Sequence, residues 1–291
     1  MTERTLTRPP RPMAPRAATT GGEVKPAGTV RFGAVSKPQG RRIMVYGPGG
    51  IGKTSLALLA PGPVAVFDLD ESLPDLSVGG QLEGLDVRAV EGIGTWAELR
   101  SALQGGGWDD IQTVVIDSVT RAEELATAHT LETVPHEKGQ KVNRIEDYGF
   151  GKGYTHVYET FLTLLGDLDR HVRAGRHVIL IAHDCTANVP NPQGDDYIRF
   201  EPRLQAPTSG KASIRLRLRE WLAFLFFVGY DLDVKNGVAR GENTRSIYTC
   251  EMPHCMAKRR PLLDVEGVAT QDVVPYEDER DGTIWRMIFG E

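Results

Sequence analysis

The sequence predicts an α/β fold with a mostly parallel central sheet. Three observations predict it: unbroken apolar runs between polar turns, helix-compatible segments that separate these runs, and a glycine-rich loop directly after the first run. Strands without polar alternation suit a parallel sheet that is covered on both faces. The chain has 291 residues, of which 40% are hydrophobic, and this is enough for one sizeable domain with extensions.

The N-terminal segment differs from the rest of the chain in charge and composition. Residues 1–42 carry nine basic and two acidic side chains, a net charge of +7, whereas the whole chain carries −5. Few of the side chains in this segment are large and apolar, so burial cannot offset the entropy of ordering it. We expect residues 1–37 to be a disordered basic tail, either a nucleic-acid tether or a plain solvated segment, and residues 38–291 to form the domain.

Strands and helices are expected to alternate along the domain. Apolar runs predict strands at 42–46, 63–68, 112–117, 177–182 and 222–230. Helices are predicted at 53–60, 95–104, 119–133 and 155–174. The stretch GFGKGY, residues 149–154, is expected to be a loop.

Beyond residue 230 the pattern predicts a C-terminal β-hairpin extension. Asn236-Gly237 is typical of a two-residue hairpin turn, and further strands are predicted at 245–250 and 284–289. The apolar run at 221–230 is too short to cross a membrane. The three cysteines form no even set, and we expect a reduced, cytoplasmic setting without a zinc site.

The stretch GPGGIGKTS, residues 47–55, has the spacing of a phosphate-binding loop between a strand and a helix. Backbone N–H groups of such a loop bind phosphates, and glycine lets the backbone approach closely. The expected cofactors are ATP and Mg²⁺. The expected nucleotide contacts are Gly47, Gly49, Gly50, Gly52, Lys53, Thr54 and Ser55.

Acidic and polar residues that follow other strands complete the expected site. Asp117 ends the run TVVID and is expected to hold Mg²⁺ together with the Thr54 hydroxyl. Asp70 and Glu71 follow the second strand and are candidates to orient water, although acids also favour a helix N-terminus. His183 follows the strand at 177–182 and either faces the γ-phosphate or only packs there.

The ordered set of these motifs resembles the phage-encoded RecA-like ATPases, and more narrowly the AAA-type phage nucleotide-binding family that includes single-strand-annealing recombination proteins. The resemblance covers about residues 40–265 and includes DYGFGKGY, HVILIAHD and EMPHCMAKRRPLLD. It implies a RecA-like P-loop NTPase core in which the His183 strand lies between the first strand and the Asp117 strand. It also implies catalytic roles for Asp70 or Glu71 and a γ-phosphate sensor at His183. The family pattern has D-x-E at the end of the second strand, where this chain has Asp68-Leu69-Asp70-Glu71, so Asp70 is the aligned residue and Glu71 is adjacent.

The same resemblance places a DNA-contacting loop at 184–213. Arg199, Arg203 and Lys211 are its expected single-stranded DNA contacts, with aromatic residues between them. Lys211 and Arg215 are alternatively candidates for a finger that reaches a neighbouring subunit's γ-phosphate.

The implied function is an ATP-binding, ATP-hydrolysing protein that acts on single-stranded DNA in phage recombination, repair or replication. The implied partners are further copies of the chain, in a ring or filament, and a single-strand-binding protein; no membrane is expected. The setting would be the cytoplasm of a bacterial host. Two alternatives stay open, a P-loop small-molecule kinase and a nucleotide-binding scaffold with little hydrolysis.

Overall fold

The structure is a computed structural model that describes residues 33, 40–208, 211–235, 238–241, 244–263 and 271–290. The chain divides into two units, residues 1–37 and residues 38–291, and the second is the domain. Apart from Gly33, the predicted tail at 1–37 lies outside the described residues.

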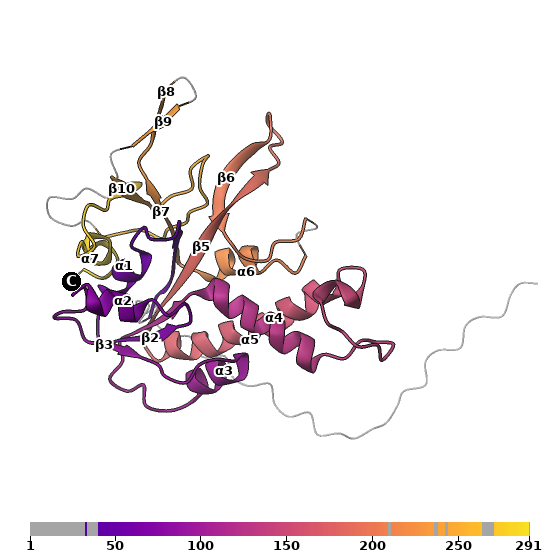
Figure 1. The fold of residues 1–291 in the computed structure, drawn as a ribbon. Coiled ribbons are helices and arrows are strands. Elements are labelled where there is room, and N and C mark those ends of the chain that lie inside the picture. Colours follow the sequence, from indigo (N-terminus) through magenta and orange to yellow (C-terminus); the bar gives the residue numbers. More distant parts are fainter. Residues whose placement is uncertain are drawn as a thin grey trace, which may run out of the picture. The chain divides into compact units, whose positions relative to one another are not determined.

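Strands and helices alternate through most of the domain (Figure 1). In chain order the strands are β1 (Arg42–Gly47), β2 (Val64–Asp68), β3 (Val87–Ala89), β4 (Thr113–Asp117), β5 (His177–Val189), β6 (Tyr197–Pro202), β7 (Phe224–Tyr230), β8 (Asp233–Lys235), β9 (Val238–Arg240), β10 (Arg245–Tyr248) and β11 (Val273–Pro275). The helices are α1 (Lys53–Leu58), α2 (Leu73–Val78), α3 (Trp96–Gln104), α4 (Val119–Thr133), the 3₁₀ turn η1 (Ile145–Tyr148), α5 (Lys152–Arg173), α6 (Ile214–Trp221) and α7 (Thr283–Phe289).

The described residues form a nine-stranded sheet in the order β11-β10-β7-β1-β5-β4-β2-β3, with β6 paired to β5. The six strands from β7 to β3 in this order are parallel, whereas β10, β11 and β6 pair antiparallel. The predicted α/β class and the mostly parallel sheet are therefore confirmed. The expected RecA-like order is confirmed as well, because β5 lies between β1 and β4.

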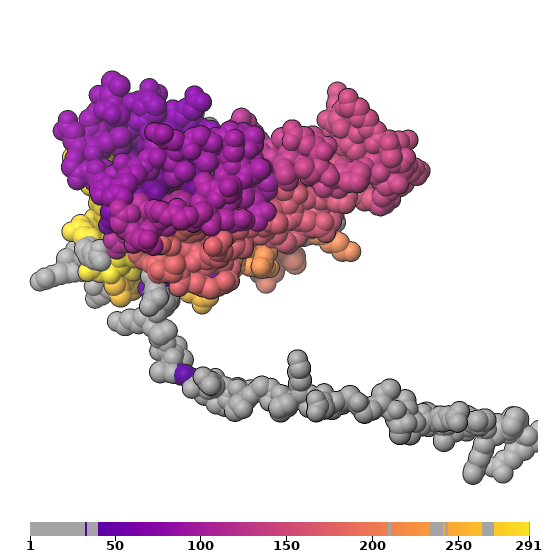
Figure 2. Space-filling model, turned by 90° about the horizontal axis from the view of Figure 1, so that it is seen from below, coloured from indigo at the N-terminus to yellow at the C-terminus, as the bar shows by residue number. Residues whose placement is uncertain are grey.

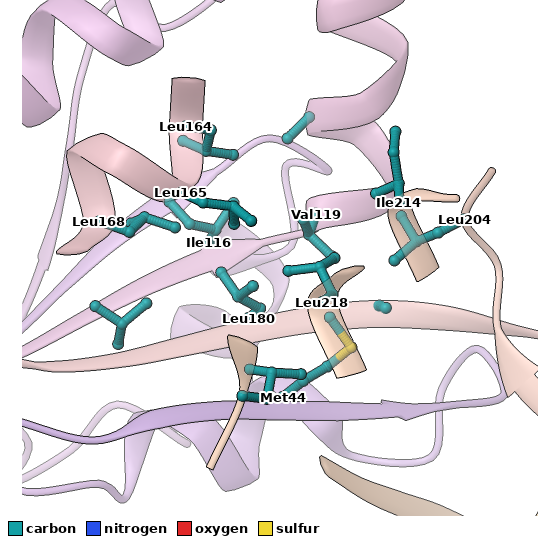
Figure 3. Close-up of a cluster of buried hydrophobic side chains, with 14 of the residues drawn as sticks. Met44, Ile116, Val119, Leu164, Leu165, Leu168, Leu180, Leu204, Ile214 and Leu218 are labelled. Carbon is teal, nitrogen blue, oxygen red and sulfur yellow. The ribbon is translucent and has the colours of Figure 1, made fainter. Parts of the chain in front are cut away.

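Helices cover both faces of the sheet, which explains why its strands are apolar without alternation. On one face, Met44, Ile116 and Leu180 pack with the apolar stripe of α5, which includes Leu164 and Leu168 (Figure 3). On the other face, neighbouring strand residues pack against α1 and α7. The hydrophobic core therefore has two layers, one on each face of the sheet. Packing on both faces holds the carboxyl ends of the parallel strands in position.

The C-terminal prediction is correct for the hairpin and wrong for the last strand. β8 and β9 pair antiparallel on either side of the predicted turn, whose residues 236–237 lie outside the described residues. Residues 284–289, predicted as a strand, lie in helix α7. Ile284, Met287 and Ile288 recur at helical spacing and are all buried, so the run has the period of a helix.

The GFGKGY stretch is only partly a loop. Gly149 and Gly151 have φ of 72° and 73°, and helix α5 begins directly afterwards at Lys152. Gly153 already lies in this helix, where a Cβ would stand 2.2 Å from the carbonyl oxygen of Ile145. This close approach lets η1 pack on the first turn of α5. The segment that joins α4 to α5 stands out from the rest of the domain (Figure 2).

Strand β5 is longer than the sequence predicts. It does not end at Ala182 but continues to Val189 and forms a hairpin with β6. Six residue pairs, from Asp184–Pro202 to Val189–Tyr197, hold this extension in register. The expected loop at 184–213 is therefore a β-hairpin followed by a shorter connection to α6.

Candidate nucleotide-binding site

The phosphate loop joins the carboxyl end of β1 to the start of α1. Its backbone N–H groups therefore lie at a helix N-terminus, where anions bind. A Cβ at Gly47 would stand 2.2 Å from the carbonyl oxygen of Val228 on β7. Gly50 and Gly52 have φ of 74° and 95°, values that glycine adopts without strain. The shape of the loop thus requires glycine at three of the predicted positions.

Lys53 lies over this loop with its side chain turned back toward β1. Its Nζ donates to the carbonyl oxygens of Gly47 at 2.9 Å and Pro48 at 2.7 Å, and the residue is buried. Burial lowers the pKa of Lys53, while the carboxylates of Asp117, Asp184 and Asp70 act in the opposite direction. The ammonium group is therefore held at the loop by weak neutral partners. A phosphate would be a stronger, charge-assisted partner for it.

Thr54 and Asp117 meet as the sequence predicts. The Thr54 hydroxyl donates to Oδ2 of Asp117 at 2.6 Å, and the Ser72 hydroxyl donates to the same oxygen at 3.2 Å. Burial raises the pKa of Asp117, although the bond from Thr54 acts against this. A hydroxyl and a carboxylate at a phosphate loop are hard oxygen ligands, the kind that Mg²⁺ accepts alongside water and phosphate oxygens. These two residues therefore fit the expected metal.

Three acids lie at the end of β2 or directly after it, and the structure gives each a different position. Asp68 accepts from the backbone N–H groups of Ser72 at 2.8 Å and Leu73 at 2.9 Å, so it fixes the start of α2. Glu71 is exposed and has a φ of 56°. Asp70 lies at the site, because its Oδ2 is 3.3 Å from Nε2 of His183, the β5 residue opposite Gly47. Of the two candidate catalytic acids, the structure thus brings Asp70 to the phosphate loop.

His183 completes this edge of the sheet. It is the β5 residue directly opposite Gly47, and its Nε2 lies 3.3 Å from Oδ2 of Asp70. Its backbone N–H donates to the Thr120 hydroxyl at 3.2 Å, which ties β5 to α4. Side chains from β2 and β5 therefore meet in front of the loop, as expected for open α/β sheets.

Two of the four basic residues expected to contact DNA or a neighbouring nucleotide are internal. Arg199 is 8% exposed and forms ion pairs with Glu201 at 2.8 Å and Glu251 at 2.6 Å. Arg215 pairs with the other oxygen of Glu201 and donates to the Leu204 carbonyl oxygen at 3.1 Å. Arg215 joins the hairpin to α6, Arg199 joins it to Glu251, and neither guanidinium is available to a ligand.

The other two, Arg203 and Lys211, are exposed. Arg203 directly follows β6, and its backbone N–H donates to the carbonyl oxygen of His183 at 2.8 Å. Lys211 precedes α6. Arg203 therefore stands at the base of the hairpin, beside the phosphate loop.

Two side chains support the phosphate loop from behind, and neither was predicted from the sequence. The Tyr276 hydroxyl donates to the Gly52 carbonyl oxygen at 2.9 Å, and Arg245 donates to the Ile51 carbonyl oxygen at 2.9 Å. The Arg245 guanidinium also lies 4.5 Å from the Tyr276 ring centroid. Ser55, a predicted nucleotide contact, directs its hydroxyl to Gln81 at 3.0 Å. Only its backbone N–H remains for a phosphate.

Residues 39–261 match the family model AAA_24, described as an AAA domain. A search of curated proteins finds no match to this sequence. Among solved structures, the flagellar accessory protein FlaH from Methanocaldococcus jannaschii is similar at 10% identity and a TM-score of 0.38, over 82% of this chain and 86% of that one. A KaiC-like protein from Pyrococcus horikoshii OT3 is similar at 15% identity and a TM-score of 0.39, over 81% and 89% of the two chains.

Two further features are absent from the part of the chain that the structure describes. No group of three or more histidine, cysteine or acidic side chains is placed to hold a metal ion by itself there. No helix in the same residues has the length and apolar character needed to cross a membrane.

Proposed function

Because the chain belongs to this family of AAA domains, we propose that it binds ATP with Mg²⁺ and hydrolyses it to control binding of single-stranded DNA. One observation carries the nucleotide part: Lys53, Thr54, Asp117, Asp70 and His183 come from four separate elements and meet at one loop. Residues that meet from distant parts of a chain at a phosphate loop favour catalysis over simple packing.

Each of these residues has a chemical task in the proposal. The loop amides and Lys53 hold the β- and γ-phosphates. Thr54 and Asp117 hold Mg²⁺, which offsets the charge that develops on the phosphates. Asp70 orients the attacking water, and the His183 ring beside it, at 3.3 Å, fixes the direction of its carboxylate.

The proposed route from nucleotide to DNA is strand β5. It passes the phosphate loop at His183 and continues without a break into the hairpin with β6 (Figure 1). Ile198 on this hairpin is 69% exposed and Tyr197 is half-buried, so apolar and aromatic surface is available for bases to stack on.

Electrostatics limits what this hairpin contributes to DNA binding. Arg199 is internal, and Asp195 and Asp196 lie at the hairpin tip, so Arg203 and Lys211 are the exposed cations left for the proposed contact. The logarithm of affinity falls by about 0.7 per neutralised phosphate for each tenfold rise in salt. We therefore expect a shallow salt dependence, dominated by stacking.

The proposal includes assembly into a ring or filament. Arg215 forms an ion pair with Glu201, whereas Lys211 is exposed. Lys211 is therefore the candidate for a finger that contacts the γ-phosphate of a neighbouring subunit. The resemblance supports a phage setting, a bacterial cytoplasm, action in recombination, repair or replication, and a single-strand-binding protein as partner.

One experiment separates this proposal from its alternatives: steady-state ATP turnover with and without single-stranded DNA, at several protein concentrations. Stimulation by DNA supports the proposal. Slow turnover that DNA does not change favours a nucleotide-binding scaffold, and turnover that requires a small acceptor molecule favours a kinase.

A further inference from the structure

Arg203 differs from the arginines around it. Arg199 and Arg215 are buried and paired with glutamates, whereas Arg203 is exposed and has no ion-pair partner among the described residues. An exposed arginine can be a solvated side chain without a role. The position of its backbone argues against that here.

Two contacts fix Arg203 beside the phosphate loop. His183 stands opposite Gly47, the first glycine of the loop, in the β1–β5 ladder. Arg203 donates its backbone N–H to the carbonyl oxygen of that same His183 at 2.8 Å. The Arg203 backbone is therefore one hydrogen bond from the strand residue that faces the loop.

Lys53 and Arg203 both contact the pair of residues at this point of the β1–β5 ladder. The Nζ of Lys53 donates to the carbonyl oxygen of Gly47 at 2.9 Å, and Gly47 lies opposite His183, whose carbonyl oxygen accepts the backbone N–H of Arg203. A γ-phosphate brings negative charge that ADP lacks, close to these two cations.

We propose that Arg203 contacts the γ-phosphate within its own subunit and so distinguishes ATP from ADP. The inference rests on the proposed ATP site and removes Arg203 from the DNA contacts. The planar guanidinium can bind two phosphate oxygens through two parallel hydrogen bonds, a geometry that a lysine ammonium does not offer.

This contact would also carry the nucleotide state into the hairpin. Arg203 is the residue after β6, so a movement of its side chain toward the γ-phosphate would displace the end of that strand. The next contact along the chain reaches α4, because the backbone N–H of Gln205 donates to Glu123 at 2.9 Å. The γ-phosphate, the hairpin and α4 are then joined by three consecutive residues.

The test measures calorimetric affinity for ADP and for a non-hydrolysable ATP analogue, both with Mg²⁺. Arg203→Ala is expected to weaken analogue binding about tenfold or more and to leave ADP affinity unchanged, since a hydrogen bond to a charged group is lost. Arg203→Lys should retain part of the difference. Arg217→Ala, another exposed arginine whose nearest acid is Glu220 at 3.6 Å, is the matched control and should change neither affinity.

Two outcomes overturn the inference. If Arg203→Ala lowers the affinities for ADP and for the ATP analogue equally, Arg203 does not contact the γ-phosphate. If it weakens DNA binding and leaves both nucleotide affinities unchanged, Arg203 belongs to the DNA contacts. Arg203 is exposed, and an unchanged melting temperature of each variant shows that folding is not the cause.

Lys53→Ala separates failure of the inference from failure of the ATP site. It should abolish binding of both nucleotides; if it does not, the proposed function itself is wrong. Mixing Arg203→Ala with Lys53→Ala protein then tests the subunit of origin. Recovered discrimination in the mixture would show that the arginine acts on a neighbouring subunit, against the proposal.

Discussion

Asp117 is the residue on which the two halves of the candidate site depend. It ends β4, and a single one of its oxygens accepts hydrogen bonds from the loop residue Thr54 and from Ser72 after β2. Because the carboxylate is almost fully buried, its negative charge is poorly solvated and burial raises its pKa. A divalent cation bound to the Asp117 carboxylate would offset the free-energy cost of burying its charge.

We therefore predict that Asp117→Asn lowers Mg²⁺-dependent ATP turnover about 10- to 100-fold, the usual effect of losing a group that orients a metal. Nucleotide affinity without Mg²⁺ should change little, since the side chain acts on the metal and not on the nucleotide. Turnover and affinity are measured across a Mg²⁺ titration, with the exposed Asp75→Asn as the control. If turnover and metal-free affinity fall together, Asp117 has a structural role.

At the scale of elements, the hairpin is fastened to α6 by charge. Glu201 on β6 lies between Arg199 and Arg215, and all three side chains are largely buried. Glu251 extends the group to Arg219 on α6. These ion pairs thus hold the base of the β5–β6 hairpin in place, and its tip takes no part in them.

Removing Glu201 tests this anchor. Glu201→Ala leaves two buried guanidinium groups without their shared carboxylate and should cost about 3–5 kcal/mol of unfolding free energy. Glu220→Ala, at an exposed acid on α6, should cost less than about 1 kcal/mol. Both are measured by urea unfolding. A cost below that of the control variant would show that water solvates the network.

Glu123 connects α4 to the residues after β6 and gives the domain a pH dependence. Burial raises the pKa of Glu123 to about 7, against the backbone hydrogen bond from Gln205 and the charge of Arg215. The protonated form is thus favoured in the folded state. The associated stability is complete below the ordinary carboxyl range and is lost as pH rises through about 7.

Glu123→Gln keeps an acceptor for Gln205 and removes the charge. We expect this variant to exceed the unchanged protein in unfolding free energy by about 3 kcal/mol at pH 8 and to match it below about pH 4. Unfolding is followed by urea titration at each pH, with the exposed Glu124→Gln as control. A difference that does not depend on pH would contradict the assignment.

At the scale of the whole molecule, residues near the C-terminus hold the phosphate loop near the N-terminus. Tyr276 and Gly52 are 224 positions apart in the sequence and share a hydrogen bond, and Trp285 donates to the Leu56 carbonyl oxygen on α1 at 2.7 Å. The loop is therefore supported from behind by β11 and α7.

Tyr276→Phe removes the hydroxyl and keeps the ring that packs on Arg245. We expect about 1 kcal/mol less stability and about fivefold weaker ATP binding, because one loop carbonyl loses its partner. Melting temperature and calorimetric affinity are the measurements, and Tyr230→Phe, at a half-exposed tyrosine, is the control. Unchanged affinity with lowered stability would limit the brace to a structural role.

Local sequence was enough to predict the strands and the loop, and not enough for the contacts between distant segments. The run Ile43–Tyr46 and the spacing up to Thr54 identify their own structure, because apolar strands and glycine turns depend on near neighbours. The last helix, α7, was missed because a six-residue apolar run fits either a strand or a helix. The pairing of Arg199 with Glu251 and the brace between Tyr276 and Gly52 could not be predicted, since the partners are far apart in the sequence.

The order of the strands at the site followed from the resemblance and is confirmed, whereas the roles of Asp70 and His183 stay predictions. The sequence also left the choice between Asp70 and Glu71 open. The structure favours Asp70, whose Oδ2 lies 3.3 Å from Nε2 of His183, whereas the backbone of Glu71 turns into the left-handed region at a φ of 56°.

The uninterrupted course of β5 has a mechanical consequence. Val189 lies six positions beyond His183 along β5. At about 3.3 Å per residue, this part of the strand is an arm of roughly 20 Å. A rotation of about 10° at the phosphate end would displace the far end by roughly 3–4 Å, about the separation of two stacked bases. A sub-ångström adjustment around a phosphate would then be amplified severalfold by leverage alone, with no need for any part of the arm to unfold.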